Sequence, residues 1–372
     1  MSGVGRALFG ALLALGLTFL LSTAPAAAAA GWWVAAPPGT PSISAVASNQ
    51  GPITLAISEG VAGWYSPSTS RFRPLQLPSG LGPKLGPALT VAAAGRLGVV
   101  GFSRGQLVEV SAGGTVLRLP PVTGLPHAAA VSGSDPALVA IATSRGLFSG
   151  RLGSSLSKIT SGGALAVIAP PNPGHAWLAL VSGRLWERPT GGRWLETRSA
   201  PTFGRTTTAL AELSSGVVLV GEPGGLIWRG VGGSWARAFQ VLPYGGLGGV
   251  PTVTSLVADG VTSAYLGTDG FGTLLTPDGG YTWYRAPPPD ARISQLATVG
   301  PVFSTHAHGL VVAVSRGGLY LHRLQALPQP PTYSPPSAGA ELVGTAAVTV
   351  VSVFLVTLLL WLMSRRQRRL SV

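Results

Sequence analysis

One strand pattern occurs seven times along the 372-residue chain, and this repetition restricts the possible folds more than any other feature of the sequence. Each copy has an apolar strand, a turn, a second apolar strand, a Gly-containing turn and further strands. The second strands begin 38 to 47 residues apart, at Ile53, Leu97, Ala137, His175, Gly216, Ser263 and Gly309. A period of about 40 to 50 residues with four short strands per unit is typical of a β-propeller, a ring of four-stranded sheets called blades.

The first strand of each copy is rich in Ala, Ser and Thr. Small side chains suit the strands nearest the centre of a ring, where neighbouring sheets crowd together. A β-solenoid would need a shorter period, and two sandwiches would not repeat seven times. We therefore predict an all-β fold, a seven-bladed β-propeller of four-stranded blades over residues 31–327. The small-residue strands are 42–48, 88–95, 127–133, 164–170, 206–212, 251–260 and 293–300.

The seventh copy lacks a fourth strand, because its third strand runs directly into a proline-rich segment. Residues 31–37 (GWWVAAP) stand alone before the first copy and resemble residues 281–287 (YTWYRAP), the outer strand of the sixth copy. Trp33 aligns with Trp283. We predict that the N-terminal strand completes the seventh blade, which closes the ring and removes an exposed sheet edge.

The two ends of the chain predict export and membrane anchoring. Residues 1–30 have one charge, Arg6, then an apolar stretch and small residues before Gly31, as in a cleaved signal peptide. An uncleaved signal anchor is the alternative. Residues 342–363 are 22 uncharged residues, enough for a transmembrane helix of about 33 Å.

The charges after residue 363 orient this helix. Four arginines follow it in the tail 364–372, which the positive-inside rule places in the cytoplasm. Residues 328–341 form a proline-rich stalk. We therefore expect a single-pass protein of the cell membrane whose N-terminal domain is extracytoplasmic; a buried core helix is the alternative for 342–363. The arginines are Arg365, Arg366, Arg368 and Arg369.

Composition leaves few groups for catalysis. The absence of cysteine excludes a disulfide scaffold, a thiol nucleophile and Cys-based metal sites. The chain holds five His and twelve Asp and Glu. His306 and His308 could share a metal, but no third ligand is near them in the sequence, so a surface turn is the preferred interpretation. No cofactor and no metal site is expected.

One segment carries a recognisable motif. Thr276, Asp278, Gly280 and Trp283 fit a Ser/Thr-x-Asp-x-Gly-x-Thr-Trp pattern, and shorter copies lacking the Asp end at Trp194 and Trp235. The Asp can accept backbone hydrogen bonds in a tight turn, Gly permits positive φ, and the Trp can be buried between sheets. This segment resembles the structural Asp-box of sialidase-like (BNR-repeat) propellers, including the Ycf48-like photosystem assembly factors.

The resemblance covers hydrolases as well as non-catalytic binders. A sialidase-type site, as the resemblance implies, needs a Tyr nucleophile beside a carboxylate, an acid/base Asp and three Arg. The carboxylates considered fall in turns or on outer strands. Residues 72–74 (FRP) match a sialidase element only faintly, so we expect Arg73 to be a solvated strand residue. We predict a non-catalytic module, with an active or degenerate sialidase-type hydrolase as the alternative. The carboxylates are Glu59, Glu187, Glu196, Glu222, Asp269 and Asp290, with Asp278 in the box.

Net charge indicates the kind of partner. Residues 31–340 hold 20 Lys and Arg against 11 Asp and Glu, a net charge of +9. A basic exported domain has affinity for anionic lipid, wall polymers or acidic proteins, whereas its location and lack of an RNA motif argue against nucleic acid.

The turn between the second and third strands gives the sharpest prediction. It carries Arg104, Arg145 and Arg184 in copies two to four and Arg316 in copy seven, whereas copies one, five and six carry Glu59, Glu222 and Asp269. In a propeller these turns share one end of the ring. Arg104, Arg145 and Arg184 are therefore predicted to bind an anionic ligand, with solvated turn charges as the alternative.

The favoured function is a surface recognition or assembly module for a protein or an anionic polymer. A sensor that passes a signal inward is a weaker reading, because the predicted cytoplasmic tail has only nine residues.

Overall fold

The computed structural model describes residues 34–35, 42–47, 54–66, 71–78, 80–132, 137–172, 174–241, 251–269, 271–286, 293–299, 310–315 and 318–323. The chain divides into two compact units, Met1–Ala326 and Leu327–Val372, and all described residues belong to the first. The predicted signal peptide, stalk, transmembrane helix and basic tail lie outside the described residues, as do His306, His308 and Arg316.

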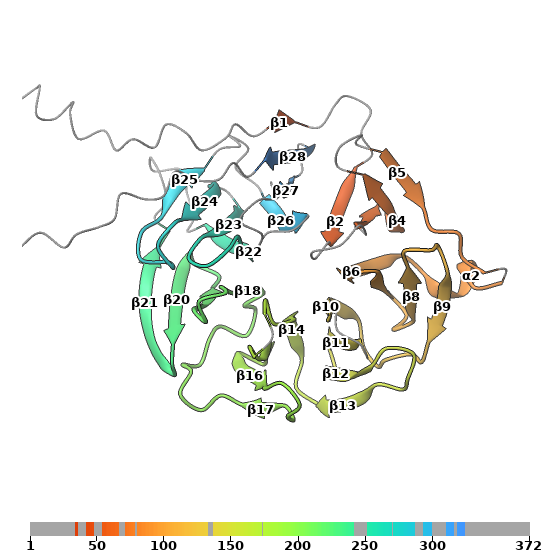
Figure 1. Cartoon of the computed structure of the whole chain (residues 1–372), viewed down its shortest axis with the longest axis horizontal. Helices are drawn as coiled ribbons and strands as arrows, with labels where there is room; N and C mark the ends of the chain where they lie inside the picture. Colours follow the sequence, from red (N-terminus) through yellow and green to blue (C-terminus); the bar gives the residue numbers. More distant parts are fainter. Residues whose placement is uncertain are drawn as a thin grey trace, which may run out of the picture. The chain divides into compact units, whose positions relative to one another are not determined.

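Six sheets each consist of four consecutive antiparallel strands, numbered here as blades 1 to 6 (Figure 1). Blade 1 is β2 (Ile43–Ala47), β3 (Leu55–Ser58), β4 (Val61–Ser66) and β5 (Arg71–Pro74). Blade 2 is β6 (Ala88–Ala94), β7 (Leu97–Phe102), β8 (Leu107–Ser111) and β9 (Val116–Leu119), and blade 3 is β10 (Pro126–Val131), β11 (Leu138–Thr143), β12 (Gly146–Arg151) and β13 (Ser157–Thr160).

The next three blades repeat the same order. Blade 4 is β14 (Ala164–Ile168), β15 (Trp177–Val181), β16 (Arg184–Arg188) and β17 (Leu195–Glu196). Blade 5 is β18 (Ala209–Glu212), β19 (Val218–Gly221), β20 (Leu226–Val231) and β21 (Ser234–Gln240), and blade 6 is β22 (Thr252–Ala258), β23 (Ala264–Asp269), β24 (Gly272–Thr276) and β25 (Tyr284–Ala286).

A further sheet, the composite sheet, joins strands from opposite ends of the first unit. Its order is β1 (Val34–Ala35), β28 (Gly318–Arg323), β27 (Leu310–Ser315) and β26 (Ile293–Val299). Val34 lies opposite Leu321, and Ala35 lies opposite Tyr320. The predicted pairing of the N-terminal strand with the last strand is confirmed. Strand β26 contacts β22 of blade 6 and β2 of blade 1.

The predicted fold class, a seven-bladed propeller with a transmembrane helix, has to be corrected. The structure describes both backbone and side chains for six four-stranded blades, which form an all-β propeller. The composite sheet is described by the course and pairing of its strands alone, and its four strands are not consecutive in the chain. The strand period gives every copy of the pattern the same weight, so it predicts seven blades. Side chains packed on the faces of a sheet are described for six sheets.

The helical part of the prediction is corrected as well. Within the described part of the chain the helix present is α2 (Gly82–Leu85), which has four residues and lies in the link from β5 to β6. No helix among these residues is long and apolar enough to cross a membrane. The described strands have two to seven residues each, so the chain turns before an apolar run is long enough for a membrane-spanning helix.

The core is a series of five apolar clusters, one between each two successive blades from blade 1 to blade 6. The alternation of side chains along a strand places successive residues on opposite faces of its sheet. On β7, Val99 packs toward blade 3 and Val100 toward blade 1, and both are fully buried. Blades 2 to 5 are therefore covered on both faces, as the uninterrupted apolar strands of the sequence require.

Glycine allows a close approach of blades 5 and 6. A Cβ added to Gly221 on β19 would lie 2.9 Å from Cβ of Val253, a residue of β22 with 1% of its surface exposed. Such a contact forces backbone or side-chain movement in a packed core.

We predict that Gly221→Ala lowers the free energy of unfolding by about 1–3 kcal/mol, because the added methyl group overpacks the interface between blades 5 and 6. Urea unfolding of the full-length chain measures the change. Gly82→Ala is the matched control, because nothing lies within 4 Å of the Cβ position of Gly82. Equal stability of the two variants would contradict the close approach.

Candidate functional site

The antiparallel order gives every blade two ends with different turns. We call the end with the turns between second and third strands the second-turn end, and the other the hairpin end. Arg104 follows β7, Arg145 follows β11 and Arg184 begins β16, so all three arginines lie at the second-turn end. All three are exposed.

Hydrogen bonds connect these turns through the links between blades. Gly105, beside Arg104, accepts a hydrogen bond from Val122 N at 2.9 Å, and Leu125 N donates to Ser144 Oγ, beside Arg145, at 3.0 Å. In the next blade Ser182 N donates to Gly163 O at 2.8 Å. The structure therefore places the three arginine turns side by side along the second-turn end of blades 2 to 4.

The three arginines differ in their partners. Arg184 Nη1 lies 3.3 Å from Glu196 Oε1, and both side chains are about half exposed. An ion pair exposed to this degree contributes at most about 1 kcal/mol. Among the residues that the structure describes, Arg104 and Arg145 form no ion pair. The first two turns are therefore the stronger candidates for an external anion.

Carboxylates occupy the corresponding turns of blades 1, 5 and 6. Glu59 lies in the exposed turn of blade 1, whose Gly60 O accepts a hydrogen bond from Ala88 N at 2.7 Å. Glu222 lies in the turn of blade 5, and its Oε1 accepts a hydrogen bond from Gly204 N at 2.9 Å. Asp269 is the last residue of β23 in blade 6.

Asp278 organises the turn between β24 and β25 at the hairpin end of blade 6. Its Oδ1 accepts hydrogen bonds from Thr276 Oγ1 at 2.9 Å, Tyr281 N at 3.1 Å and Thr282 N at 2.9 Å. Its Oδ2 accepts one from Thr282 Oγ1 at 2.5 Å. Gly280, with φ of 93°, donates its N–H to Thr276 Oγ1 at 2.8 Å. The local geometry is the one expected for the motif.

The same turn is attached to blade 5. Arg229 of β20 donates from Nε to Gly279 O at 2.8 Å, and its guanidinium lies 4.0 Å from the ring centre of Tyr281. Trp283 is buried in the cluster between blades 5 and 6, with its ring 6.3 Å from that of Phe239, and its Nε1 donates to Gly280 O at 3.1 Å. The predicted burial of Trp283 between sheets is confirmed.

Electrostatics at Asp278 favour its charged form. Burial raises the pKa of the carboxyl, but the hydrogen bonds from Thr282, Thr276 and Tyr281 together outweigh this effect, so the pKa lies below its ordinary value of 3.8.

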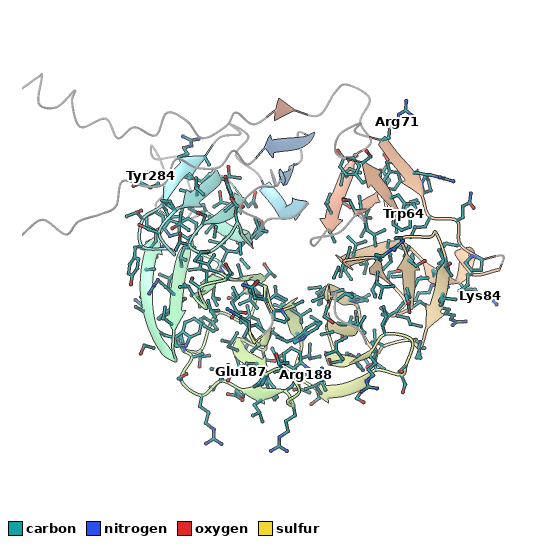
Figure 2. All side chains as sticks on the ribbon, viewed as in Figure 1. Trp64, Arg71, Lys84, Glu187, Arg188 and Tyr284 are labelled. Atoms are coloured by element: carbon teal, nitrogen blue, oxygen red, sulfur yellow. The ribbon has the colours of Figure 1, made fainter. Side chains whose placement is uncertain are left out.

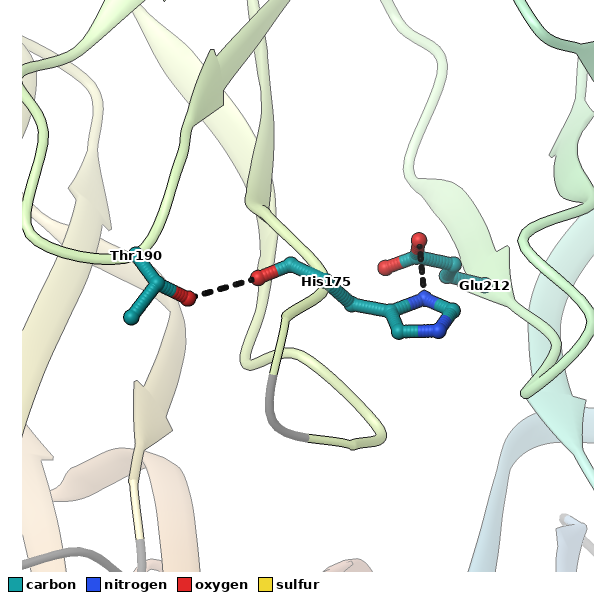
Figure 3. A network of polar contacts seen from close by, with 3 residues as sticks. All are labelled: His175, Thr190 and Glu212. Carbon is teal, nitrogen blue, oxygen red and sulfur yellow. Dashed lines mark hydrogen bonds and ion pairs between the residues drawn. The ribbon is translucent and has the colours of Figure 1, made fainter.

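A second polar contact joins blades 4 and 5 at the hairpin end, and the sequence reasoning missed it. His175 Nδ1 lies 2.8 Å from Glu212 Oε1, and 9% of the Glu212 side chain is exposed (Figure 3). Thr190 Oγ1 donates to His175 O at 3.3 Å. The sequence offered one signal for this contact. Glu212 is an acidic residue at the end of an inner strand made of small residues.

Burial raises the pKa of Glu212, the Glu187 carboxylate raises it further, and the hydrogen bond and charge of His175 act in the opposite direction. Glu212 Oε2 is buried and has no hydrogen-bond partner among the described residues. Asp259, directly after inner strand β22, has its pKa raised to about 7 by burial.

Two further interpretations can be compared with the structure. Arg73 lies on the outer strand β5 and is exposed, which confirms a solvated strand arginine. In the described part of the chain no group of three or more His, Asp or Glu side chains is arranged to hold a metal ion.

At the level of sequence, no family model and no curated protein matches this chain. Solved structures do match. YCF48 bound to a D1 peptide aligns with a TM-score of 0.58 and 12% identity over 81% of this chain and 97% of that one. The β-propeller domain of Cps50 (Swd1) from Myceliophteria thermophila aligns with a TM-score of 0.58 and 10% identity over 79% and 100%. The mitotic checkpoint complex contains a chain that aligns with a TM-score of 0.58 and 12% identity over 79% and 95%.

These similarities define the class of fold, a β-propeller. At 10 to 12% identity they show the fold and nothing more. The repeat in the sequence had predicted that architecture. Membership of the Asp-box, sialidase-like family is not confirmed by these matches and stays a prediction.

We predict that Asp278→Asn lowers the free energy of unfolding by about 1–2 kcal/mol at pH 7, because a charged acceptor of several hydrogen bonds is lost. The folded pKa lies below the ordinary one, so this contribution is complete above pH 3.8 and is lost as the pH falls through the folded pKa. The difference between wild type and variant, measured by urea unfolding, should shrink in acid. Gly82→Ala, which removes no titratable group and meets nothing within 4 Å of its Cβ position, should show no such trend.

We predict that His175→Ala destabilises the chain more at pH 7 than at pH 4. Loss of His175 removes the hydrogen bond and the charge that lower the pKa of Glu212. The pKa of Glu212 therefore rises further above its ordinary value of 4.5. A carboxyl with a raised folded pKa loses stabilisation as the pH rises toward that pKa. Unfolding at both pH values measures the effect, and His127→Ala, at an exposed position on β10, is the control. An equal loss at both pH values would contradict the coupling.

Proposed function

We propose that this chain is a non-catalytic recognition or assembly module that binds a protein or an anionic polymer through the second-turn end of blades 2 to 4. In this proposal the propeller is exported and held at the cell membrane. The residues that make first contact are Arg104, Arg145 and Arg184.

The observation that carries the proposal is the continuous row of exposed arginine turns. Neighbouring turns are tied to the links between blades by backbone hydrogen bonds, so the row is held in place before any partner arrives. A preorganised set of guanidinium groups loses little conformational freedom on binding, and guanidinium pairs readily with carboxylate and phosphate. The fold supports the same role, because propellers such as YCF48 have been solved with a peptide bound.

A sialidase-type hydrolase is the second candidate, favoured by the hydrogen-bonded Asp278 turn that resembles an Asp-box. That turn is structural, and it supplies neither the Tyr nucleophile nor the acid that hydrolysis needs. A fluorogenic sialoside assay of the purified chain separates the two. Turnover by wild type would favour the hydrolase, whereas the binding proposal expects none.

We predict that the triple variant Arg104→Ala, Arg145→Ala, Arg184→Ala loses about tenfold or more of its partner binding, because three cations at one end are removed. In-cell cross-linking of the tagged full-length chain identifies the partner, and its capture at rising salt measures the loss.

The matched control is Arg71→Ala, Arg237→Ala, Arg285→Ala. These arginines are exposed and lie on β5, β21 and β25, the outer strands of blades 1, 5 and 6. Partner capture should survive the control variant. Equal capture by the two triple variants, or no loss in either, would contradict the assignment of the binding surface to blades 2 to 4.

A further inference from the structure

Charge is distributed unevenly around the propeller. Residues 80–198, which contain blades 2 to 4, hold 11 Lys and Arg against 4 Asp and Glu, a net charge of +7. Residues 199–286, which contain blades 5 and 6, hold 4 Lys and Arg against 5 Asp and Glu, a net charge of −1. A general bias of the sequence toward arginine would affect both stretches alike, so it does not account for the difference.

The basic residues of blades 2 to 4 follow a regular arrangement. Each of the three blades exposes one cation at the second-turn end, one at the hairpin end and one on or just after its outer strand. The members are Arg104, Arg96 and Arg118 in blade 2, Arg145, Arg151 and Lys158 in blade 3, and Arg184, Arg193 and Arg198 in blade 4. We call these nine residues the basic band.

Two further cations lie beside the basic band. Lys84 on α2 is exposed at the outer side of blade 2 (Figure 2). Arg188 is half-buried and is used within the protein, since its Nε donates to Gly192 O at 3.0 Å and its Nη1 to Ser149 Oγ at 3.4 Å.

The basic band has few internal counter-charges. Arg184 pairs with Glu196, and Arg118 donates to the neutral Gln106 side chain at 2.7 Å. The other seven members form no ion pair among the residues that the structure describes. Like charges on neighbouring blades repel one another and concentrate anions near the surface. An external polyanion would relieve that repulsion.

The arrangement also restricts the shape of the ligand. The nine cations occupy both ends and the outer edge of three consecutive blades, so no plane can touch all of them. A flat anionic bilayer would meet one end or one edge. A flexible linear chain with closely spaced negative charges can cross one end, pass the outer edge and reach the other end.

We propose that the basic band binds a flexible linear polyanion, with phosphate or carboxylate groups along its backbone, that passes over both ends and the outer edge of blades 2 to 4. The inference rests on the proposed recognition role and specifies one partner class for it. Binding releases counterions from the polymer, so affinity falls with salt at a rate set by the number of cations engaged.

The test uses polyphosphate as the probe and the purified full-length chain in a neutral detergent. Three triple alanine variants each remove one row: Arg104, Arg145 and Arg184; Arg96, Arg151 and Arg193; or Arg118, Lys158 and Arg198. We expect each variant to reduce the slope of log K against log salt by about 2, because each loses three contacts worth about 0.7 each on a single-stranded polyanion. Fluorescence titration at several salt concentrations measures the slopes, and thermal melts confirm folding.

Two controls make the result specific. Arg237→Ala, Arg285→Ala removes two exposed cations from the outer strands of blades 5 and 6 and should leave the slope unchanged. Arg104→Lys, Arg145→Lys, Arg184→Lys keeps the charge and should also keep the slope.

Several outcomes would overturn the inference. One is a loss confined to the first triple, which would indicate a site at one end. Others are equal losses in the blade 5 and 6 control, tighter binding to phosphatidylglycerol vesicles than to polyphosphate, or no polyphosphate binding. If polyphosphate fails to bind while cross-linking still depends on Arg104, Arg145 and Arg184, the recognition function survives and the polyanion is excluded.

Discussion

Burial of each blade on both faces is the constraint on which the rest of this structure depends. Alternate residues of one strand pack against opposite neighbours, as Val139 and Ala140 of β11 do with blades 2 and 4. Burial of this apolar surface supplies the main driving force for the arrangement. In the described blades it covers the faces of the inner strands, so exposed polar side chains lie mainly in turns, in links and on the outer strands.

Polar contacts then fix how neighbouring blades meet at their ends. Asp278 closes its own turn, and Arg229 ties that turn to blade 5 through Gly279 and Tyr281. His175 and Glu212 join blades 4 and 5 in the same region. The hairpin end of blades 4 to 6 is thus held by contacts among its own polar side chains, whereas the side chains of Arg104 and Arg145 at the second-turn end form no ion pair among the described residues.

Much of the fold could be predicted because a strand period, small inner residues and Gly-rich turns are local signals. The pairing of β1 with β28 could also be predicted, from the aligned Trp33 and Trp283. Side-chain partners could not be predicted. The contacts of Glu196 with Arg184 and of Glu212 with His175 depend on how strands and blades meet in space. The sequence predicts seven blades because every copy of the strand pattern has the same weight. It predicts the helix from an apolar C-terminal run that lies outside the described residues.

The pairing of Val34 with Leu321 has a consequence for biogenesis. Its two strands are separated by almost the whole domain, so a ribosome must release nearly all of the chain before they can meet. Contacts of such sequence separation carry a large loop-closure entropy and slow the final step of folding. Until then the nascent propeller keeps an open seam, at which chaperones, proteases and other nascent chains compete with the chain's own first strand.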